Sequence, residues 1–543
     1  MPSNVRDLLI ALLAAATIAL VFIAKPPLQG AHWDAPIYLQ RGKIAAETPL
    51  LDSYRKHAGE IAAALPQYKP GVVDTPYWGF MRLGHTLLLG LVTAVTGANL
   101  TGLHVSTALY TLMFALTVAT AALLAIRLLG LFAPDLPASA VRRGAFLSAG
   151  LYVASDIARY LAGNLVAEIP AMLLLTLAAL LLVEATRSHR PALAMLSGVA
   201  AFGLFATKME LVWGYIVFFL LYAFMFVRHA GPRAAWRPFA SAAIVALALY
   251  GTYAWWFHPL ADPRTFLMYA RADQARPPNP VAPIKLWLVA GGLLWIGLLL
   301  GLWRGRGQPV WWYTLGWLGL VSLPYYDQLL HGGPAQARFF ASTMIPLMVG
   351  STLGWAGLLQ NGMPTPAGKA TRLALFFVIA ALIGISHQDP YRWLSALPGG
   401  WRLQHVKAFL SPPPYERLDY PVDELETASR FLYGKKMPVV VVLDKDVPEE
   451  YSNIIAYFGP RLAPVDTLAP GGDSWGNCGR KVLLPALETV MFCTVPPTLE
   501  SFQRLQGKAQ VLRMQRIGAA TSGASSDQST AIFVTKSLAL VPW

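Results

Sequence analysis

Charged residues are scarce in this chain: Asp, Glu, Lys and Arg together make up 13% of its 543 residues. A soluble globular domain typically carries about 25% charged residues. Hydrophobic residues make up 55% of the chain instead, and the mean hydropathy is +0.47. This composition excludes a disordered protein, because disordered segments are poor in apolar residues, and it argues against a cytosolic enzyme.

Cysteine is almost absent, and the two cysteines that occur, Cys478 and Cys493, both lie near the C-terminus. They are not spaced as a CxxC pair, so the sequence lacks that signature of a zinc or redox site. Outside the cell the two would form a disulfide, whereas in the cytosol two unrelated thiols would be expected. The membrane topology therefore decides between these alternatives.

Acidic residues are also few, since 29 Asp and Glu stand against 43 Lys and Arg, which gives a formal net charge of +14. In a soluble protein such an excess would suggest nucleic-acid binding. Here the basic residues lie mostly between apolar runs, and cytoplasmic loops of membrane proteins are enriched in Lys and Arg. We therefore interpret the positive charge as a topology signal and expect no nucleic-acid partner.

Long apolar runs are abundant. Runs of roughly 17–25 residues predict an α-helical polytopic membrane protein, because about 20 helical residues cross the hydrocarbon core. The first run, from Leu8 to Ala24, follows Arg6 and leads into Lys25 and two prolines. It is longer than the apolar core of a cleavable signal. We expect an uncleaved first span with the N-terminus in the cytoplasm.

The short apolar run from Leu83 to Gly97 requires a choice. If it crossed the membrane, Arg127, Arg142 and Arg143 would fall outside, against the positive-inside rule. We therefore expect it to lie in the interface or to re-enter, which gives about eleven spans. The expected spans are 8–24, 102–126, 144–162, 168–186, 191–207, 209–227, 238–257, 285–303, 309–326, 339–360 and 373–387.

Eleven spans divide the chain into two parts. Residues 1–390 would form a transmembrane module with its first outer loop over 25–101, and residues 391–543 would form a small α/β domain outside the membrane. Strands are expected there at Val439 to Leu443 and at Ala531 to Thr535, which are short and rich in β-branched residues. In such a domain Cys478 and Cys493 can pair, with two unpaired buried thiols as the alternative.

This topology gathers four ionisable residues on the outer face. Asp34 follows the first span, Glu168 opens the fourth, Lys208 lies in the turn after the fifth, and Arg338 opens the tenth. Ionisable groups at membrane depth are costly and are candidates for function. A carboxylate can accept a proton from an attacking hydroxyl, and Lys and Arg can neutralise a phosphate leaving group. These residue types suit glycosyl transfer from a lipid-phosphate sugar.

The segments that carry these residues, in this order and sidedness, resemble the GT-C glycosyltransferases. This polyprenyl-phosphate-sugar-dependent group includes protein O-mannosyltransferases and the lipid A aminoarabinose transferase. The resemblance covers about residues 1–390 as a series of short motifs. The motifs are His32-Trp33-Asp34-Ala35-Pro36-Ile37-Tyr38, Asp74-Thr75-Pro76-Tyr77-Trp78, Glu168-Ile169-Pro170, Thr207-Lys208 and Ala337-Arg338-Phe339-Phe340 followed by Pro346.

The resemblance implies a GT-C-like fold and an inverting single displacement at the sugar's anomeric carbon. Asp34 corresponds to the general base, Glu168 to a second acidic site residue, and Lys208 and Arg338 to the groups that bind the donor phosphate. No cofactor is certain. A divalent metal cation with Asp34 and Glu168 as candidate ligands stays open, although Ala35 stands where many relatives have a second acid.

The implied enzyme transfers a sugar from a polyprenyl-phosphate donor to a lipid, glycan or protein acceptor outside the cytoplasm, in the plasma (bacterial inner) membrane. Simpler structural roles are a helix cap for Asp34 or Glu168, a solvated turn for Lys208 with Glu210 as its partner, and an interfacial anchor for Arg338. The rival functions are a transporter or a lipid-linked glycan flippase or ligase. A transporter would show Gly/Pro-broken spans near the midplane and an inverted repeat, and the sequence shows neither convincingly.

Overall fold

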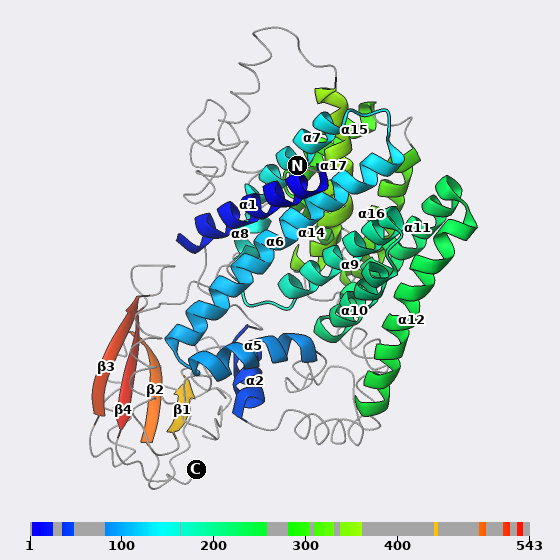
Figure 1. Cartoon of the computed structure of the whole chain (residues 1–543). Helices are drawn as coiled ribbons and strands as arrows, with labels where there is room; N and C mark the ends of the chain where they lie inside the picture. Colours follow the sequence, from blue (N-terminus) through cyan, green and yellow to red (C-terminus); the bar gives the residue numbers. More distant parts are fainter. Residues whose placement is uncertain are drawn as a thin grey trace, which may run out of the picture.

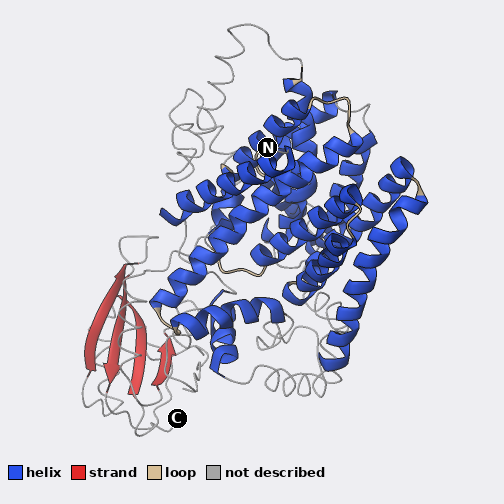
Figure 2. Ribbon diagram, viewed as in Figure 1, coloured by secondary structure: helices blue, strands red, loops and turns tan. Residues whose placement is uncertain are grey.

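The computed structural model describes residues 3–24, 35–47, 82–162, 164–257, 281–304, 309–330 and 337–360, together with four strands further along the chain. The described residues between 3 and 360 form a helical bundle (Figures 1 and 2). Its helices are α1 (Ser3–Ala24), α2 (Ala35–Glu47), α5 (Leu83–Thr96), α6 (Leu100–Phe132), α7 (Ala138–Val153), α8 (Asp156–Ala162), α9 (Glu168–Ser188), α10 (Pro191–Thr207), η2 (Met209–Leu211), α11 (Val212–Ala230), α12 (Pro232–Phe257), α14 (Val281–Gly291), α15 (Leu294–Arg304), α16 (Pro309–Leu330), η3 (Ala337–Thr343) and α17 (Met344–Leu359).

Five helical stretches among the described residues are long and apolar enough to cross a membrane. They are Thr101–Phe132, Glu168–Ser188, Met209–Ala230, Pro232–Trp256 and Phe340–Leu359. Three shorter apolar helices accompany them: Asp7–Leu20, Leu83–Thr96 and Pro191–Thr207. The protein therefore has the helices of a membrane protein, but the structure does not confirm a count of eleven spans. The expected span 373–387 lies outside the described residues.

Several expected helix boundaries are close to those in the structure. The span expected at 168–186 is α9, and those expected at 191–207 and 209–227 are α10 and η2 with α11. Glu168 is in the first turn of α9 and Arg187 in its last, where each charge complements the helix dipole. Pro191 opens α10, a position where its missing N–H has no helical partner to lose.

Two expected spans are broken in the structure. The segment 144–162 is divided between α7 and α8, and the segment 285–303 between α14 and α15. The second break contains Gly292, whose φ of +51° is in the left-handed region that favours glycine. Gly292 lies against Ser155 in the first break. The expectation that these two spans are unbroken was therefore wrong, because a single Ser-Asp pair or Gly pair hardly changes the hydropathy of a run of about twenty residues.

Helix α1 packs on α6 through small side chains. Ala11, Ala15 and Ala19 recur every four residues and so share one face of α1. They are buried in a cluster with Ala115 and Ala119 of α6. Small residues allow two apolar helices to approach closely, which is a common way to associate helices in a membrane. This contact fixes the first helix of the chain against the bundle.

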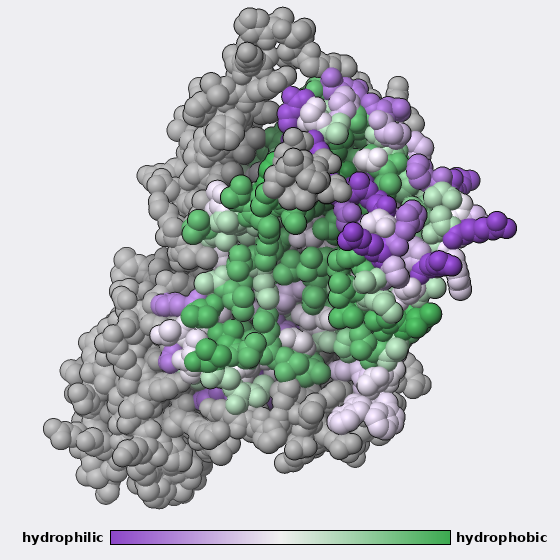
Figure 3. Space-filling view, viewed as in Figure 1, coloured by the Kyte–Doolittle hydropathy of each residue, from purple (hydrophilic) through white to green (hydrophobic). Residues whose placement is uncertain are grey.

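Hydrophobic residues cover much of the described surface in Figure 3, with hydrophilic residues gathered at the end where α11 passes into α12. Several large apolar side chains are exposed on these two helices, among them Leu220, Phe224, Ile244 and Leu247. In a soluble protein a patch of this kind would mark an interface or an aggregation risk. On apolar helices of this length it matches a surface in contact with lipid.

The described strands lie after residue 438 and form one four-stranded sheet in the order β1-β2-β4-β3. The strands are β1 (Val439–Leu443), β2 (Glu488–Val495), β3 (Met514–Thr521) and β4 (Ser529–Thr535). β1 pairs with β2 in parallel, and β4 pairs with β2 and β3 antiparallel. Both strands expected from the sequence, at 439–443 and 531–535, are present. Cys478 lies outside the described residues and Cys493 is known only as a backbone position in β2, so the disulfide stays a prediction.

Candidate functional site

Three residues from distant parts of the chain meet at one end of the bundle. Glu168 is the first residue of α9, Lys208 directly follows the last residue of α10, and Arg338 is in the first turn of η3. Pro170 is tolerated in the first turn of α9 because no intrahelical hydrogen bond is lost there. Lys208 has extended backbone angles (φ −157°, ψ 93°), so the chain turns at this residue between two helices.

Glu168 lies between the two cations. Lys208 Nζ donates a hydrogen bond to Glu168 Oε1 over 2.7 Å, and Arg338 Nε lies 3.6 Å from the same oxygen. All three side chains are at most 3% exposed. Such burial is costly for an isolated charge, so the pairing is what allows these groups to be charged inside the bundle. Glu168 Oε2 has no hydrogen-bond partner among the described residues.

A second ion pair, which the sequence analysis missed, lies beside the first. Arg82 Nη2 donates to Glu210 Oε1 over 3.2 Å, and the Tyr325 hydroxyl donates to the Glu210 backbone carbonyl over 3.1 Å. The structure thus pairs Glu210 with Arg82, and Glu210 stands two residues after Lys208 in the chain. The one sequence signal for Arg82 was its place directly before a short apolar run. Among the described residues, three cations and two carboxylates give this buried cluster a net charge of +1.

Aromatic rings connect the cluster to α2, a helix that was not expected from the sequence. The Arg82 guanidinium lies 5.3 Å from the centre of the Tyr38 ring. Tyr38 in turn meets the buried ring of His85 edge-on at 4.3 Å, and His85 meets Tyr110 of α6 at 5.6 Å. Tyr38 is the fourth residue of α2, at the end of its first turn. The start of α2 is therefore close to Arg82.

The predicted site residues have different outcomes. The structure brings Glu168, Lys208 and Arg338 together, and their parts in chemistry stay predictions. Asp34, the predicted general base, lies outside the described residues, although it directly precedes α2 in the chain. Cys478 also lies outside them.

A divalent cation at Glu168 does not fit its described neighbours. Lys208 and Arg338 already place two positive charges at Glu168 Oε1, and a third cation would be repelled by them. Among the described residues there is no group of three His, Cys, Asp or Glu side chains that could hold a metal ion. Asp34, the other predicted ligand, lies outside these residues, so a metal bound there stays a prediction.

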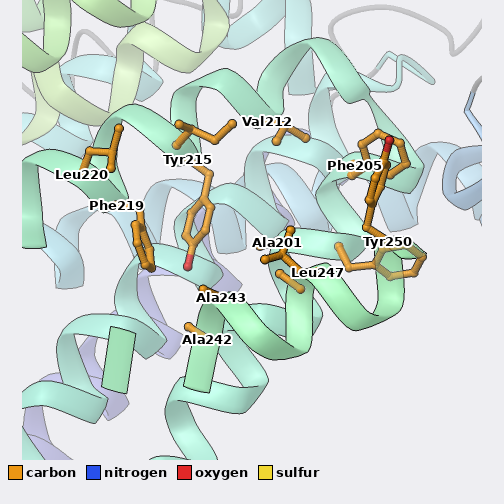
Figure 4. Close-up of a pocket in the computed structure, with 13 residues that line it drawn as sticks. Ala201, Phe205, Val212, Tyr215, Phe219, Leu220, Ala242, Ala243, Leu247 and Tyr250 are labelled. Carbon is orange, nitrogen blue, oxygen red and sulfur yellow. The ribbon is translucent and has the colours of Figure 1, made fainter. Parts of the chain in front are cut away.

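An apolar pocket of about 360 Å³ lies between α10, α11 and α12 (Figure 4). Phe205 of α10 and Val212 of α11 line it, and these residues stand three before and four after Lys208 in the chain. The pocket continues along α11 to Leu220, which is 61% exposed. It is therefore a groove on the apolar surface of the bundle that starts within about one helical turn of Lys208.

In comparisons with known protein families and with curated proteins, nothing matches this chain. The function is therefore argued from the site itself.

Proposed function

We propose that this protein is a membrane glycosyltransferase that moves a sugar from a polyprenyl-phosphate donor to an acceptor outside the cytoplasm. The observation that supports this most is the buried cluster of Glu168, Lys208 and Arg338 beside the Arg82–Glu210 pair. Its net positive charge lies at the end of apolar helices, where a lipid-linked phosphate would be. Arginine and lysine are the usual partners of such a phosphate.

The apolar groove adds a place for the donor's tail. It is lined by apolar side chains of three helices and is open to the surface of the bundle at Leu220 and Leu247, both more than half exposed. A polyprenyl chain is a flexible apolar ligand that a groove of this kind can accept. Because the groove starts near Lys208, a donor with its tail in the groove would bring its phosphate towards the cations.

The proposed reaction is a single displacement. Asp34 takes the proton of the acceptor hydroxyl, and the acceptor oxygen forms a bond to the anomeric carbon of the sugar. The bond from that carbon to the phosphate oxygen breaks, and polyprenyl phosphate leaves with the electron pair. Lys208 and Arg338 stabilise the leaving phosphate, and Glu168, through its Oε2, orients the acceptor. The sugar inverts its configuration in such a step, and a retained configuration would contradict it.

The test is an assay on purified protein in lipid with a panel of polyprenyl-phosphate sugars and cell-extract acceptors. Release of free polyprenyl phosphate by the wild type, and its loss in Asp34→Asn, would support both the donor class and the base. Asp52→Asn is the matched control, because it removes another acid of the same expected outer loop. Equal release by wild type and Asp34→Asn would remove Asp34 from the reaction, and no release from any donor would contradict the proposed activity.

A transporter or flippase is the second candidate, and one observation favours it. Two broken helices pack at their breaks, where Gly292 lies against Ser155, and discontinuous helices often form the binding site of transporters. A transport assay in vesicles with a fluorescent lipid-linked sugar separates the two functions. Movement of the lipid without cleavage of its sugar–phosphate bond would favour the transporter.

A further inference from the structure

A second charged cluster lies at the other end of α9. Glu168 begins this helix, and Glu184 follows sixteen residues later, which is about 24 Å along a helix axis. Arg127 Nε donates to Glu184 Oε1 over 2.6 Å, and its Nη1 donates to Asp7 Oδ2 over 3.1 Å. The separation is close to the thickness of a membrane core. The two clusters therefore lie at opposite ends of a helix that is long enough to cross a membrane.

This second cluster surrounds a pocket of about 510 Å³. Arg127, Arg142 and Arg187 line the pocket, together with Asp7 and Asp135. Asp7 is 1% exposed and forms ion pairs with Arg127 and Arg142, and its Oδ1 lies 2.7 Å from Arg142 Nε. Arg187 Nη1 donates to Glu184 over 3.2 Å. The carboxylates thus fix the three guanidinium groups around the pocket.

The arginines keep donors for a ligand. A guanidinium has five N–H donors. Among the described residues, carboxylates contact two nitrogens of Arg127, two of Arg142 and one of Arg187. The side chains of Arg142 and Arg187 are 22% and 30% exposed, so these donors are accessible. Planar guanidinium groups with free N–H groups bind phosphate oxygens well, often through two parallel hydrogen bonds.

The start of α7 adds to the positive potential in this pocket. Pro137 and Ala138, at the N-terminus of α7, line it, and the first turn of that helix contains no acidic residue. The backbone N–H groups of a helix N-terminus attract anions. Asp135 is exposed at the same pocket, where solvent screens its charge. The buried and half-buried charges therefore favour an anion.

We propose that this pocket binds the phosphate headgroup of an anionic phospholipid. Its place at the ends of apolar helices puts it at the level of lipid headgroups, and basic pockets between helices are typical headgroup sites. The apolar side chains of Ile126 and Val141 at the same pocket suit the lipid's glycerol and upper acyl chains. The proposal does not depend on the activity proposed for the other end of the bundle.

The experiment uses the full-length protein in a neutral detergent, with thermal unfolding followed by tryptophan fluorescence. Short-chain phosphatidylglycerol, short-chain phosphatidylcholine and inorganic phosphate are titrated separately. We expect phosphatidylglycerol to raise the Tm of the wild type in a saturable way. Arg187→Gln should weaken its apparent affinity roughly tenfold, since one charged donor is lost. Asp135→Asn should strengthen it roughly two- to threefold by removing a repulsive charge.

Arg228→Gln is the matched control. Arg228 is in the last turn of α11, its guanidinium lies 5.0 Å from the centre of the Phe224 ring, and it does not line the pocket. Its affinity for phosphatidylglycerol should equal that of the wild type. The proposal would be overturned if Arg187→Gln bound phosphatidylglycerol as tightly as the wild type does. It would also be overturned if phosphatidylcholine raised the Tm of the wild type as much as phosphatidylglycerol does. An equal response to inorganic phosphate would overturn the lipid as its ligand. If Arg187→Gln does not fold, an unchanged affinity in Asp135→Asn would overturn the site.

Discussion

Lys208 Nζ lies 2.7 Å from Glu168 Oε1, with both side chains almost fully buried, although forty residues separate them in the chain. This pair joins the first turn of α9 to the turn after α10. It also fixes where two opposite charges are held inside an apolar bundle. The stability of the bundle and its proposed chemistry therefore depend on the same two side chains.

Removing Lys208 should destabilise the protein strongly. Lys208→Met leaves Glu168 buried with Arg338 as its nearest cation, and breaking a buried ion pair costs about 3–5 kcal/mol. The double variant Lys208→Met/Glu168→Gln should regain part of this loss, because no uncompensated carboxylate is left. Unfolding in mixed micelles would measure the coupling energy, which we expect to exceed about 2 kcal/mol.

The Glu184–Arg187 pair is the control for this cycle. Its side chains are 27% and 30% exposed and three residues apart on α9, and Arg127, which also contacts Glu184, is kept in all four variants of its cycle. Partly exposed pairs of this kind contribute about 0.2–1 kcal/mol. A coupling at Lys208–Glu168 no larger than that of the control pair would show that burial adds nothing to the interaction.

Arg82 should contribute to donor binding. Arg82→Gln removes one of the three cations of the cluster and leaves Glu210 without that ion pair. If the donor phosphate binds here, its KM should rise about tenfold, the equivalent of 1.4 kcal/mol. Arg82→Lys should recover part of this loss, because it restores the charge but not the planar donor pair.

Initial rates of polyprenyl phosphate release against donor concentration would measure this effect. Arg143→Gln is the control, since Arg143 lies in the first part of α7 and its Nε donates to the Ser139 carbonyl in an exposed position. An Arg82→Gln variant with the KM and kcat of the wild type would exclude Arg82 from the site.

The sequence predicted best those helices whose ends carry charges or proline. α9 begins at Glu168 and α10 at Pro191, and both boundaries were expected correctly. The breaks at Ser155 and Gly292 were not expected, because one or two polar or glycine residues hardly lower the hydropathy of a long apolar run. The adjacent glycines Gly291 and Gly292 were an available signal, since paired glycines often mark a turn.

The candidate site was predicted in part. The alternation of spans placed Glu168, Lys208 and Arg338 at one end, because each stands at a helix boundary of the same sidedness. Arg82 was missed, because pairing with Glu210 depends on how α5 packs against the turn after α10. Packing between segments more than a hundred residues apart leaves no local pattern in the chain.

Asp7 should hold α1 in place. Its carboxylate contacts Arg127 of α6 and Arg142 of α7 at 3.1 and 2.7 Å, and it is 1% exposed. Asp7→Asn would leave two neighbouring arginines without their shared anion, at a cost of about 3 kcal/mol. Hydrogen exchange by mass spectrometry should show that Asp7→Asn speeds up exchange in residues 3–24, relative to the wild type, more than it does in α9. Asp135→Asn removes an exposed acid of the same pocket and should leave this exchange unchanged; equal exchange in both variants would contradict the prediction.

Gly292 should be intolerant of any side chain. Its φ of +51° costs a non-glycine residue about 1–2 kcal/mol. A Cβ at this position would also lie 2.5 Å from Ser155 Cβ and 2.7 Å from Ser155 Oγ. Gly292→Ala should therefore lower the Tm, whereas Gly316→Ala in α16 should not, since a Cβ there meets nothing within 4 Å.

The two causes can be separated with a second substitution. Ser155→Gly removes the side chain that a Cβ at Gly292 would meet, but it leaves the backbone angle unchanged. The loss of stability in Gly292→Ala/Ser155→Gly should therefore be smaller than the sum of the losses in the two single variants. About 1–2 kcal/mol of it should remain, as the cost of the backbone angle. If the losses of stability in the two single variants simply add, the two broken helices are not in tight contact at this point. The breaks would then be independent features of α7–α8 and α14–α15, and the observation that favours a transporter would lose its basis.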